Sequence, residues 1–393
     1  MRYLIVAFMT LCFLNTNLSF FLFPAVIILE YIVIRKGMIK TGVFNSVPLF
    51  FLALFGVFYV GAYGFSLNSF RIYFITPILV YVSSWFFVEI SDKNNKEEEV
   101  LKLICCMLAG FAVHALLNAL TNETSTRGEV EDIFYGEFLS ATCAGAINTG
   151  ICSMITCLII TKRKAVKIVG SVFLVIALWY ASILGSRTQI VITVIVFVIT
   201  FYLYLHESDA SDQRIKNFRW LLLIAAVIAV IYYCDFLSIR TTVENSNLYG
   251  RFTESQQESD SLRVERFIEG LTVIFREPFG DPDAKYFHNF WLDIGRTSGI
   301  IPFLFILFYS IVVVVHGLRI FKRKQLPRIF RFTVLSIYLG LLMNLFVEPA
   351  MEGMYDIVLS FIFINGAVDC FYYSEYKNVV NSIENKINSE EQK

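Results

Sequence analysis

Long apolar runs alternate with short polar stretches along the chain, and this pattern predicts its elements. Twelve apolar runs occur in the 393 residues, most of them near the length of about 20 residues that a membrane-spanning helix needs. Helices are predicted rather than strands, because backbone groups that face lipid must form their hydrogen bonds within the segment. The sequence therefore predicts an all-α polytopic membrane protein with about twelve transmembrane helices. The runs lie near residues 3–14, 20–34, 47–65, 72–90, 100–120, 134–160, 168–184, 189–205, 220–236, 299–318, 332–347 and 357–373.

The distribution of Lys and Arg predicts the orientation of these helices. Basic residues gather in the even-numbered loops, such as 162–167 and 319–331, whereas the short odd-numbered loops carry one or none. Cytoplasmic loops of membrane proteins are enriched in Lys and Arg, so both termini are predicted to be cytoplasmic. The outward-facing basic residues are almost all arginines, a bias that membrane insertion alone does not explain. They are Arg71, Arg127, Arg187, Arg240, Arg251, Arg263, Arg266, Arg276, Arg296 and Lys285.

One outward loop, at 237–298, is much longer than the others, and it divides the chain. Residues 1–236 are predicted to form nine helices and residues 299–373 three more, with a cytoplasmic tail at 374–393. Loops of this length are uncommon unless they are functional or disordered. Apolar residues at helical spacing predict an amphipathic helix at about 261–277 within this loop, on the membrane surface or over the bundle.

The ends of that helix have their own signals. Asp260 or Ser261 could cap its start, and Pro278 ends it, because the residue before a proline leaves the helical region.

Composition narrows the class of protein. Hydrophobic residues make up 56% of the chain and charged residues 17%, with 33 basic residues balancing 33 acidic ones. A soluble domain usually carries about 25% charged residues, and a nucleic-acid-binding domain carries a basic excess. Neither class fits. The spacing of His, Cys and acidic residues suggests no metal site, and no glycine-rich phosphate loop is present, so no cofactor is predicted.

The candidate chemistry lies at the outward face. His288 stands in an aromatic stretch before the tenth run, where it could instead anchor a helix end at the interface. Arg187 lies in a polar break between two apolar runs, while Arg263 and Arg266 are three residues apart on the predicted loop helix. Guanidinium groups bind phosphate through two parallel hydrogen bonds, although each arginine could also be a surface residue. The other histidines are weaker candidates: His114 within a run, and His206 and His316 at cytoplasmic helix ends.

Two outward loops are acidic. These residues could simply be solvated surface charges, or they could form hydrogen bonds to the hydroxyls of a sugar acceptor. The acidic residues are Glu123, Glu129, Glu131, Asp132, Glu137, Glu348, Glu352 and Asp356.

Several short motifs follow one another along the chain: Gly185-Ser186-Arg187, Ser261-Leu262-Arg263-Val264-Glu265-Arg266-Phe267, Glu277-Pro278-Phe279-Gly280, His288-Asn289-Phe290-Trp291-Leu292 and Ser298-Gly299-Ile300-Ile301. In this order and spacing they resemble the O-antigen polymerase and O-antigen ligase superfamily. The resemblance covers the whole architecture of about twelve helices with one large periplasmic loop late in the chain. One departure occurs after Gly280, where Asp281-Pro282-Asp283 stands in place of the family's frequent Gly-x-Gly.

The resemblance implies a metal-independent glycosyltransferase of lipopolysaccharide biosynthesis, with a C-type multi-helix fold, in the bacterial inner membrane. Its substrates would be oligosaccharides and polysaccharides linked to undecaprenyl diphosphate, and a chain-length regulator protein is a further candidate partner. His288 would be the catalytic histidine, as a general base or a positioning group. Arg187, Arg263 and Arg266 would bind the diphosphate at the periplasmic face and stabilise its charge as it leaves.

The sequence leaves three functions as alternatives. A polymerase joins carrier-linked repeat units, whereas a ligase transfers the finished glycan to lipid A–core; the sequence His288–Phe303 looks closer to polymerases. The alternative of another class is a flippase or other transporter. A transporter is expected to show repeats and ionisable residues inside its spans. The sequence shows no repeat between its halves and few ionisable residues within the predicted spans.

Overall fold

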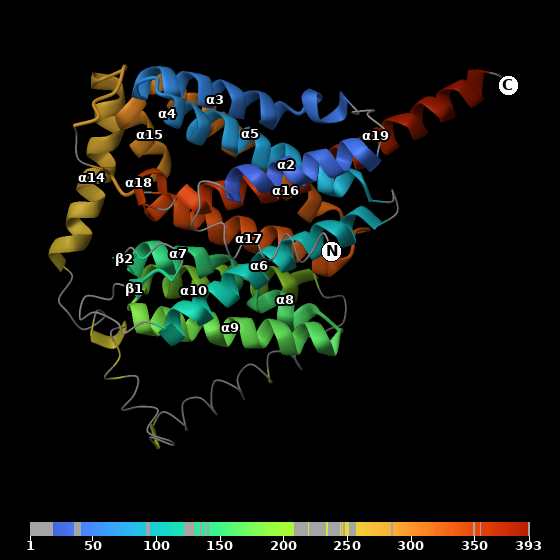
Figure 1. The fold of residues 1–393 in the computed structure, drawn as a ribbon. Coiled ribbons are helices and arrows are strands. Elements are labelled where there is room, and N and C mark those ends of the chain that lie inside the picture. Colours follow the sequence, from blue (N-terminus) through green and yellow to red (C-terminus); the bar gives the residue numbers. More distant parts are fainter. Residues whose placement is uncertain are drawn as a thin grey trace. The chain divides into compact units, whose positions relative to one another are not determined.

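The computed structural model of the chain is almost entirely helical in the residues that it describes (Figure 1). It divides into two compact units. Unit 1 contains residues 1–110, 261–338 and 345–393, and unit 2 contains residues 111–260 and 339–344. The described residues are 19–34, 41–91, 95–121, 130–133, 136, 138–139, 141–207, 219, 233–234, 244, 246, 248–250, 257–283, 286–348, 350–353 and 355–391.

Seven helices in the described residues are long and apolar enough to cross a membrane, which confirms the class of membrane-embedded all-α protein. Each matches one of the predicted runs. Three further runs correspond to shorter apolar helices at Pro24–Ile34, Val47–Tyr63 and Asn148–Ile160, and the runs at 3–14 and 220–236 lie largely outside the described residues. The count of twelve and the orientation therefore stay predictions. The seven are Leu67–Glu89, Lys96–Thr121, Lys164–Leu184, Arg187–Glu207, Ile300–Lys322, Arg328–Val347 and Tyr355–Glu375.

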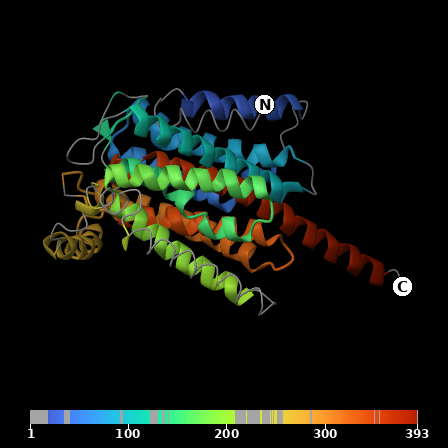
Figure 2. The same cartoon turned by 90° about the horizontal axis from the view of Figure 1, so that it is seen from below.

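Unit 1 is a bundle of long apolar helices that run alongside one another (Figures 1 and 2). Aromatic contacts join them: Tyr31 stacks on Phe86 with centroids 3.9 Å apart, and Phe51 lies 5.6 Å from Phe308. The elements that lie wholly in this unit are α2 (Ser19–Ile34), η1 (Thr41–Asn45), α3 (Val47–Tyr63), α4 (Leu67–Phe70), η2 (Arg71–Ile75), α5 (Thr76–Glu89), α15 (Phe290–Ser298), α16 (Ile300–Lys322), α18 (Ala350–Gly353) and α19 (Tyr355–Glu391).

Three helices have residues in both units. They are α6 (Lys96–Thr121), α14 (Gln257–Arg276) and α17 (Arg328–Val347). The predicted loop helix is α14, which ends before Pro278 as expected. The predicted cap at Asp260 or Ser261 is wrong, because the helix begins at Gln257 and both residues lie inside it.

Unit 2 contains α7 (Ala141–Cys152), α8 (Ile155–Ile160), α9 (Lys164–Leu184) and α10 (Arg187–Glu207). Small residues let these helices approach: a Cβ atom at Gly145 would lie 2.7 Å from the Cβ of Ser186, ahead of α10. The apolar run at 134–160 is not one helix. It begins with β2 (Phe138–Leu139), which pairs antiparallel with β1 (Val130–Glu131), and a turn separates α7 from α8.

Candidate functional site

The motifs that surround His288 form one compact structure in unit 1. The turn after α14 packs against the junction of α15 and α16, where the Ile300 N–H donates to the Pro278 carbonyl at 3.0 Å. Gly280 and Gly299 both have positive φ, 90° and 86°. A Cβ atom on Gly280 would lie 2.8 Å from the backbone nitrogen of Gly299. Both positions therefore require glycine, because two backbones touch there in a conformation that other residues rarely adopt.

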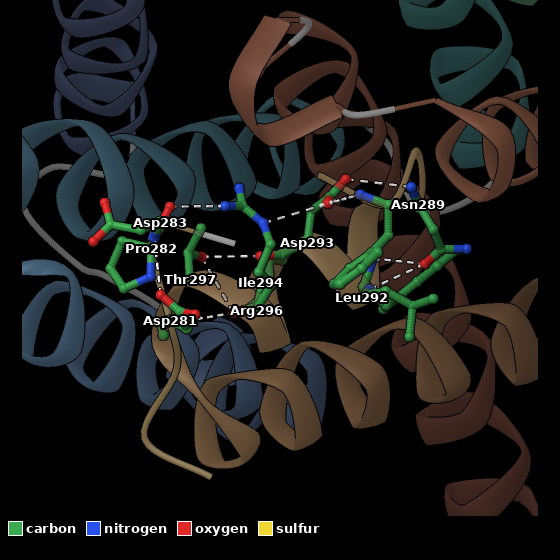
Figure 3. Close-up of polar contacts among 12 residues, drawn as sticks. Asp281, Pro282, Asp283, Asn289, Leu292, Asp293, Ile294, Arg296 and Thr297 are labelled. Atoms are coloured by element: carbon green, nitrogen blue, oxygen red, sulfur yellow. Dashed lines mark hydrogen bonds and ion pairs between the residues drawn. The ribbon is translucent and has the colours of Figure 1, made fainter. Parts of the chain in front are cut away.

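Arg296 holds the turn from the side of α15 (Figure 3). Its guanidinium donates to the Pro282 carbonyl at 2.9 Å, its backbone carbonyl accepts from the Asp281 N–H, and its Nε lies 3.8 Å from Asp293 Oδ1. The side chain is only 4% exposed. The contacts that Arg296 forms in the folded chain therefore hold the turn after α14 against α15.

His288 has an unusual backbone. Its φ of 54° is the only positive value for a non-glycine residue in the described part of the chain. Such conformations cost energy and cluster at functional sites. The side chain is half-buried, with its ring edge-on to Tyr286 at a centroid distance of 4.7 Å.

Asp293 fixes the backbone on both sides of His288 (Figure 3). One carboxylate oxygen accepts the Phe287 N–H at 2.6 Å, and the other accepts the Asn289 N–H at 3.3 Å. Burial raises the pKa of the Asp293 carboxyl above its ordinary value, while the Phe287 N–H and the Arg296 guanidinium act in the opposite direction. This buried carboxyl is thus the group that holds the left-handed residue in place.

Asn289 connects the same segment to two other helices. Its side-chain oxygen caps α15 by accepting the N–H groups of Trp291 and Leu292, at 3.1 and 3.0 Å. Its Nδ2 donates to the Phe346 carbonyl at the end of α17, at 2.9 Å. The Trp291 indole donates to Ser310 in α16 at 3.0 Å. His288 therefore projects from a backbone that three helices hold.

Replacing Asp293 with asparagine should loosen this segment. Asparagine offers one acceptor where the aspartate has two, so one of the two backbone N–H groups beside His288 must lose its partner. We expect a loss of about 1–3 kcal/mol in stability, the usual cost of an unsatisfied buried group. Thermal unfolding of the purified protein in detergent measures the loss. Asp283→Asn, at an exposed position of the same turn, is the control. Equal unfolding of the two variants would contradict the role given to Asp293.

Arg263 and Arg266 both lie in α14. The side chain of Arg263 is outside the described residues, so its predicted role stays a prediction. Arg266 is half-buried, and within the described part of the chain its guanidinium forms no hydrogen bond or ion pair. One turn later, Gly270 packs on the segment that carries His288: a Cβ atom there would lie 2.9 Å from the Phe287 ring. Arg266 therefore lies one helical turn before the point where α14 contacts the segment that carries His288.

Arg187 lies in unit 2, as the first residue of α10, and is half-buried. Gly185 ends α9 in the left-handed conformation, with φ of 68°, and the Ser186 N–H donates to the Ala181 carbonyl at 3.0 Å. The predicted polar break is thus a tight turn between two helices. Because Arg187 belongs to the other unit, its convergence with Arg266 and His288 stays a prediction.

A second ionisable cluster is buried in unit 2, at His114 of α6. Its Nε2 lies 2.7 Å from Asp132 Oδ2, and Asn118 donates to the same carboxylate at 3.2 Å. Asp132 is fully buried, and so is Glu348, at 1% exposure. The interpretation of the acidic loops as solvated charge is wrong for these two residues, because both side chains are buried in the folded protein.

A third cluster crosses unit 1 within the spans. His316 of α16 lies 2.7 Å from Asp369 of α19, whose other oxygen accepts the Tyr81 hydroxyl of α5 at 2.6 Å. Ser46 extends this hydrogen-bond network, since its Oγ lies 2.7 Å from the Tyr81 hydroxyl. The interpretation of His316 as a helix-end charge is therefore wrong. The expectation of few ionisable residues inside the spans stays a prediction, with His316 and Asp369 as two such residues in the described spans.

No protein-family model and no curated protein matches this sequence. The fold and its buried polar clusters define the class as an all-α membrane protein. Sequence reasoning missed Asp293 and the bracing role of Arg296. The signal was present as Asn289, Asp293 and Arg296, which follow one another at helical spacing directly after His288.

Proposed function

We propose that this protein is a glycosyltransferase of the O-antigen polymerase type. It would join repeat units linked to undecaprenyl diphosphate at the periplasmic face of the bacterial inner membrane. The observation that carries the proposal is the left-handed His288, held between two backbone hydrogen bonds to the buried Asp293. A strained residue that the surrounding structure fixes so closely is typical of functional sites.

The proposed reaction is a direct displacement at the anomeric carbon of the donor sugar. The acceptor hydroxyl oxygen forms a bond to that carbon, while the bond from the carbon to the diphosphate oxygen breaks. His288 takes the proton of the acceptor hydroxyl or positions that hydroxyl, and a neutral imidazole is suited to either role. Arg266, Arg263 and Arg187 would neutralise the carrier diphosphate as it leaves, since preorganised cations stabilise developing charge.

A substitution pair on one helix tests the diphosphate role. Arg266→Ala should shorten the surface glycan to single repeat units, because the donor loses a guanidinium. Arg266→Lys should restore only part of the chain length, since lysine lacks the planar fork. Arg276→Ala is the matched control, because Arg276 is exposed at the end of the same helix, with Glu277 beside it at 3.6 Å. Gel profiles of the glycan give the readout, with membrane insertion checked in parallel. Unchanged chain length for Arg266→Ala would contradict the proposal.

The ligase alternative shares the donor half of the reaction. Deletion of the gene separates the two, since a polymerase defect leaves one repeat unit on the lipid A–core. A ligase defect leaves a bare core and strands the glycan on the carrier.

The transporter alternative has one specific observation in its favour, the His316–Asp369 pair within the spans. Ionisable residues there often mark ion or substrate pathways. A transporter would leave lipid-linked units on the cytoplasmic side when the gene is deleted, and would depend on His316 and Asp369. A polymerase would leave the units at the periplasmic side and depend on His288 and Arg266. Locating the stranded units therefore distinguishes the two classes.

A further inference from the structure

The helix α14 has three faces, which differ in what they contact. Its protein-facing side carries Gly270, Val273 and Ile274, which are buried, the last two packing with Phe287 and Leu292. A second side carries a row of exposed large apolar residues. A third side, beyond that row, carries exposed polar residues. These are Glu265, Glu269, Thr272 and Arg276.

The exposed apolar row is narrow and continuous. We name it the outer stripe: Val264, Ile268, Leu271 and Phe275, which are 62%, 60%, 42% and 75% exposed. At about 100° per residue, the four positions fall within a sector of about 60°. A soluble helix of this kind would show one apolar face toward the core and polar residues elsewhere. Here a second apolar face, beside the buried one, is left exposed.

The orientation of α14 suits a helix that lies in a membrane surface. Within unit 1, α14 runs crosswise at one end of the long helices: it stands across them in Figure 1 and is seen end-on in Figure 2. If those helices cross the membrane, α14 lies along its plane. A helix with adjacent apolar and polar sides, lying in that plane, is typical of an interfacial helix with its apolar face in the headgroup and acyl boundary.

The outer stripe is followed in sequence by an exposed apolar residue that lies at the start of a spanning helix. This residue is Phe279, which is 87% exposed. Its backbone lies against Gly299, where a Cβ atom would come within 2.9 Å of the Phe279 Cα, and α16 begins at the next residue. Along α16, Ile301, Leu304 and Phe308 are exposed on one face. An exposed apolar face of a spanning helix meets lipid, so the same lipid is the nearest occupant for the stripe.

We infer that α14 is an interfacial helix whose outer stripe inserts into the lipid leaflet at this end of the spans. The partner is the acyl region of the bilayer, and the inference does not depend on the reaction proposed above. Its consequence concerns Arg266, which a helix at this depth would hold near the level of lipid phosphates. The diphosphate of a lipid-linked donor would lie at the same level.

Fluorescence quenching in vesicles tests the insertion. The full-length protein, with its eight native cysteines replaced, receives single cysteines at Ile268 or Phe275 in the stripe, or at Glu269 or Thr272 on the polar side. Each is labelled with a small fluorophore and reconstituted in phosphatidylcholine and phosphatidylglycerol vesicles. We expect nitroxide-labelled lipids to quench the two stripe positions several-fold more than the two polar positions, and aqueous iodide to show the reverse order.

Two outcomes would overturn the inference. Equal quenching at all four positions would mean that the stripe faces water, and shielding from both quenchers would mean that a protein, such as a second copy, covers it. If the cysteine-free chain fails to fold, a photo-crosslinking amino acid at position 275 of the otherwise native chain makes the same distinction. A crosslink to lipid supports insertion, and a crosslink to protein or no crosslink contradicts it.

Discussion

Replacement of Gly299 by alanine should be among the most destabilising single changes in this protein. Gly299 has φ of 86° and ψ of −176°, a region that is essentially restricted to glycine. The new Cβ atom would also meet the backbone of Phe279 at 2.8 Å and the carbonyl oxygen of Pro278. Backbone strain costs about 1–3 kcal/mol, and overpacking about 1–3 kcal/mol more. We therefore expect a loss of about 2–6 kcal/mol, measured by thermal unfolding in detergent.

Two other glycines separate the causes of that loss. Gly64 has φ of 108° but open space around its Cβ position, so Gly64→Ala measures strain without the steric contact. Gly61 lies inside α3 with open space, so Gly61→Ala should be neutral or slightly stabilising. The expected order of stability is Gly61→Ala, then Gly64→Ala, then Gly299→Ala. If Gly299→Ala unfolds together with Gly64→Ala, the contact between the turn and α15 is not restrictive.

The fold was predictable where the sequence pattern is local. Seven predicted runs are helices of spanning length, since twenty apolar residues in succession have few other structures available. The run at 134–160 was misassigned at its start because Gly136, with φ of 64°, reverses the chain and lets Phe138 pair with Glu131. Hydropathy cannot show such a turn, because it does not report backbone handedness.

The candidate site was predictable only in part, for a related reason. His288 was singled out by residue type and position, whereas its left-handed backbone is a property of three-dimensional packing. Asp293 looked like one more acidic residue in a loop, and its role depends on two backbone N–H groups that face it only in the folded chain. The His316–Asp369 pair joins residues 53 positions apart, so no sequence spacing could indicate it.

Substitution of His288 gives the sharpest test of function, because glycine and alanine separate structure from chemistry at this position. The alternative interpretation makes His288 an interfacial anchor of a helix end, for which its side chain matters to stability. The left-handed backbone makes the opposite prediction for His288→Gly. Relief of strain of about 1–2 kcal/mol offsets the greater freedom of glycine in the unfolded chain, about 0.5–1 kcal/mol. We expect the unfolding temperature of His288→Gly to equal or exceed that of the wild-type protein.

Activity should change in the other direction. Loss of a general base or positioning group typically lowers a rate by about 10²–10⁴-fold, so formation of polymer from lipid-linked repeat units should fall by that order in His288→Gly and His288→Ala alike. His288→Ala keeps the strain and should be the less stable of the two. A residue selected for chemistry at the expense of stability behaves in this way. A His288→Gly protein that loses stability would show that His288 anchors the fold. One that still forms long chains in reconstituted vesicles would leave the reaction to other groups.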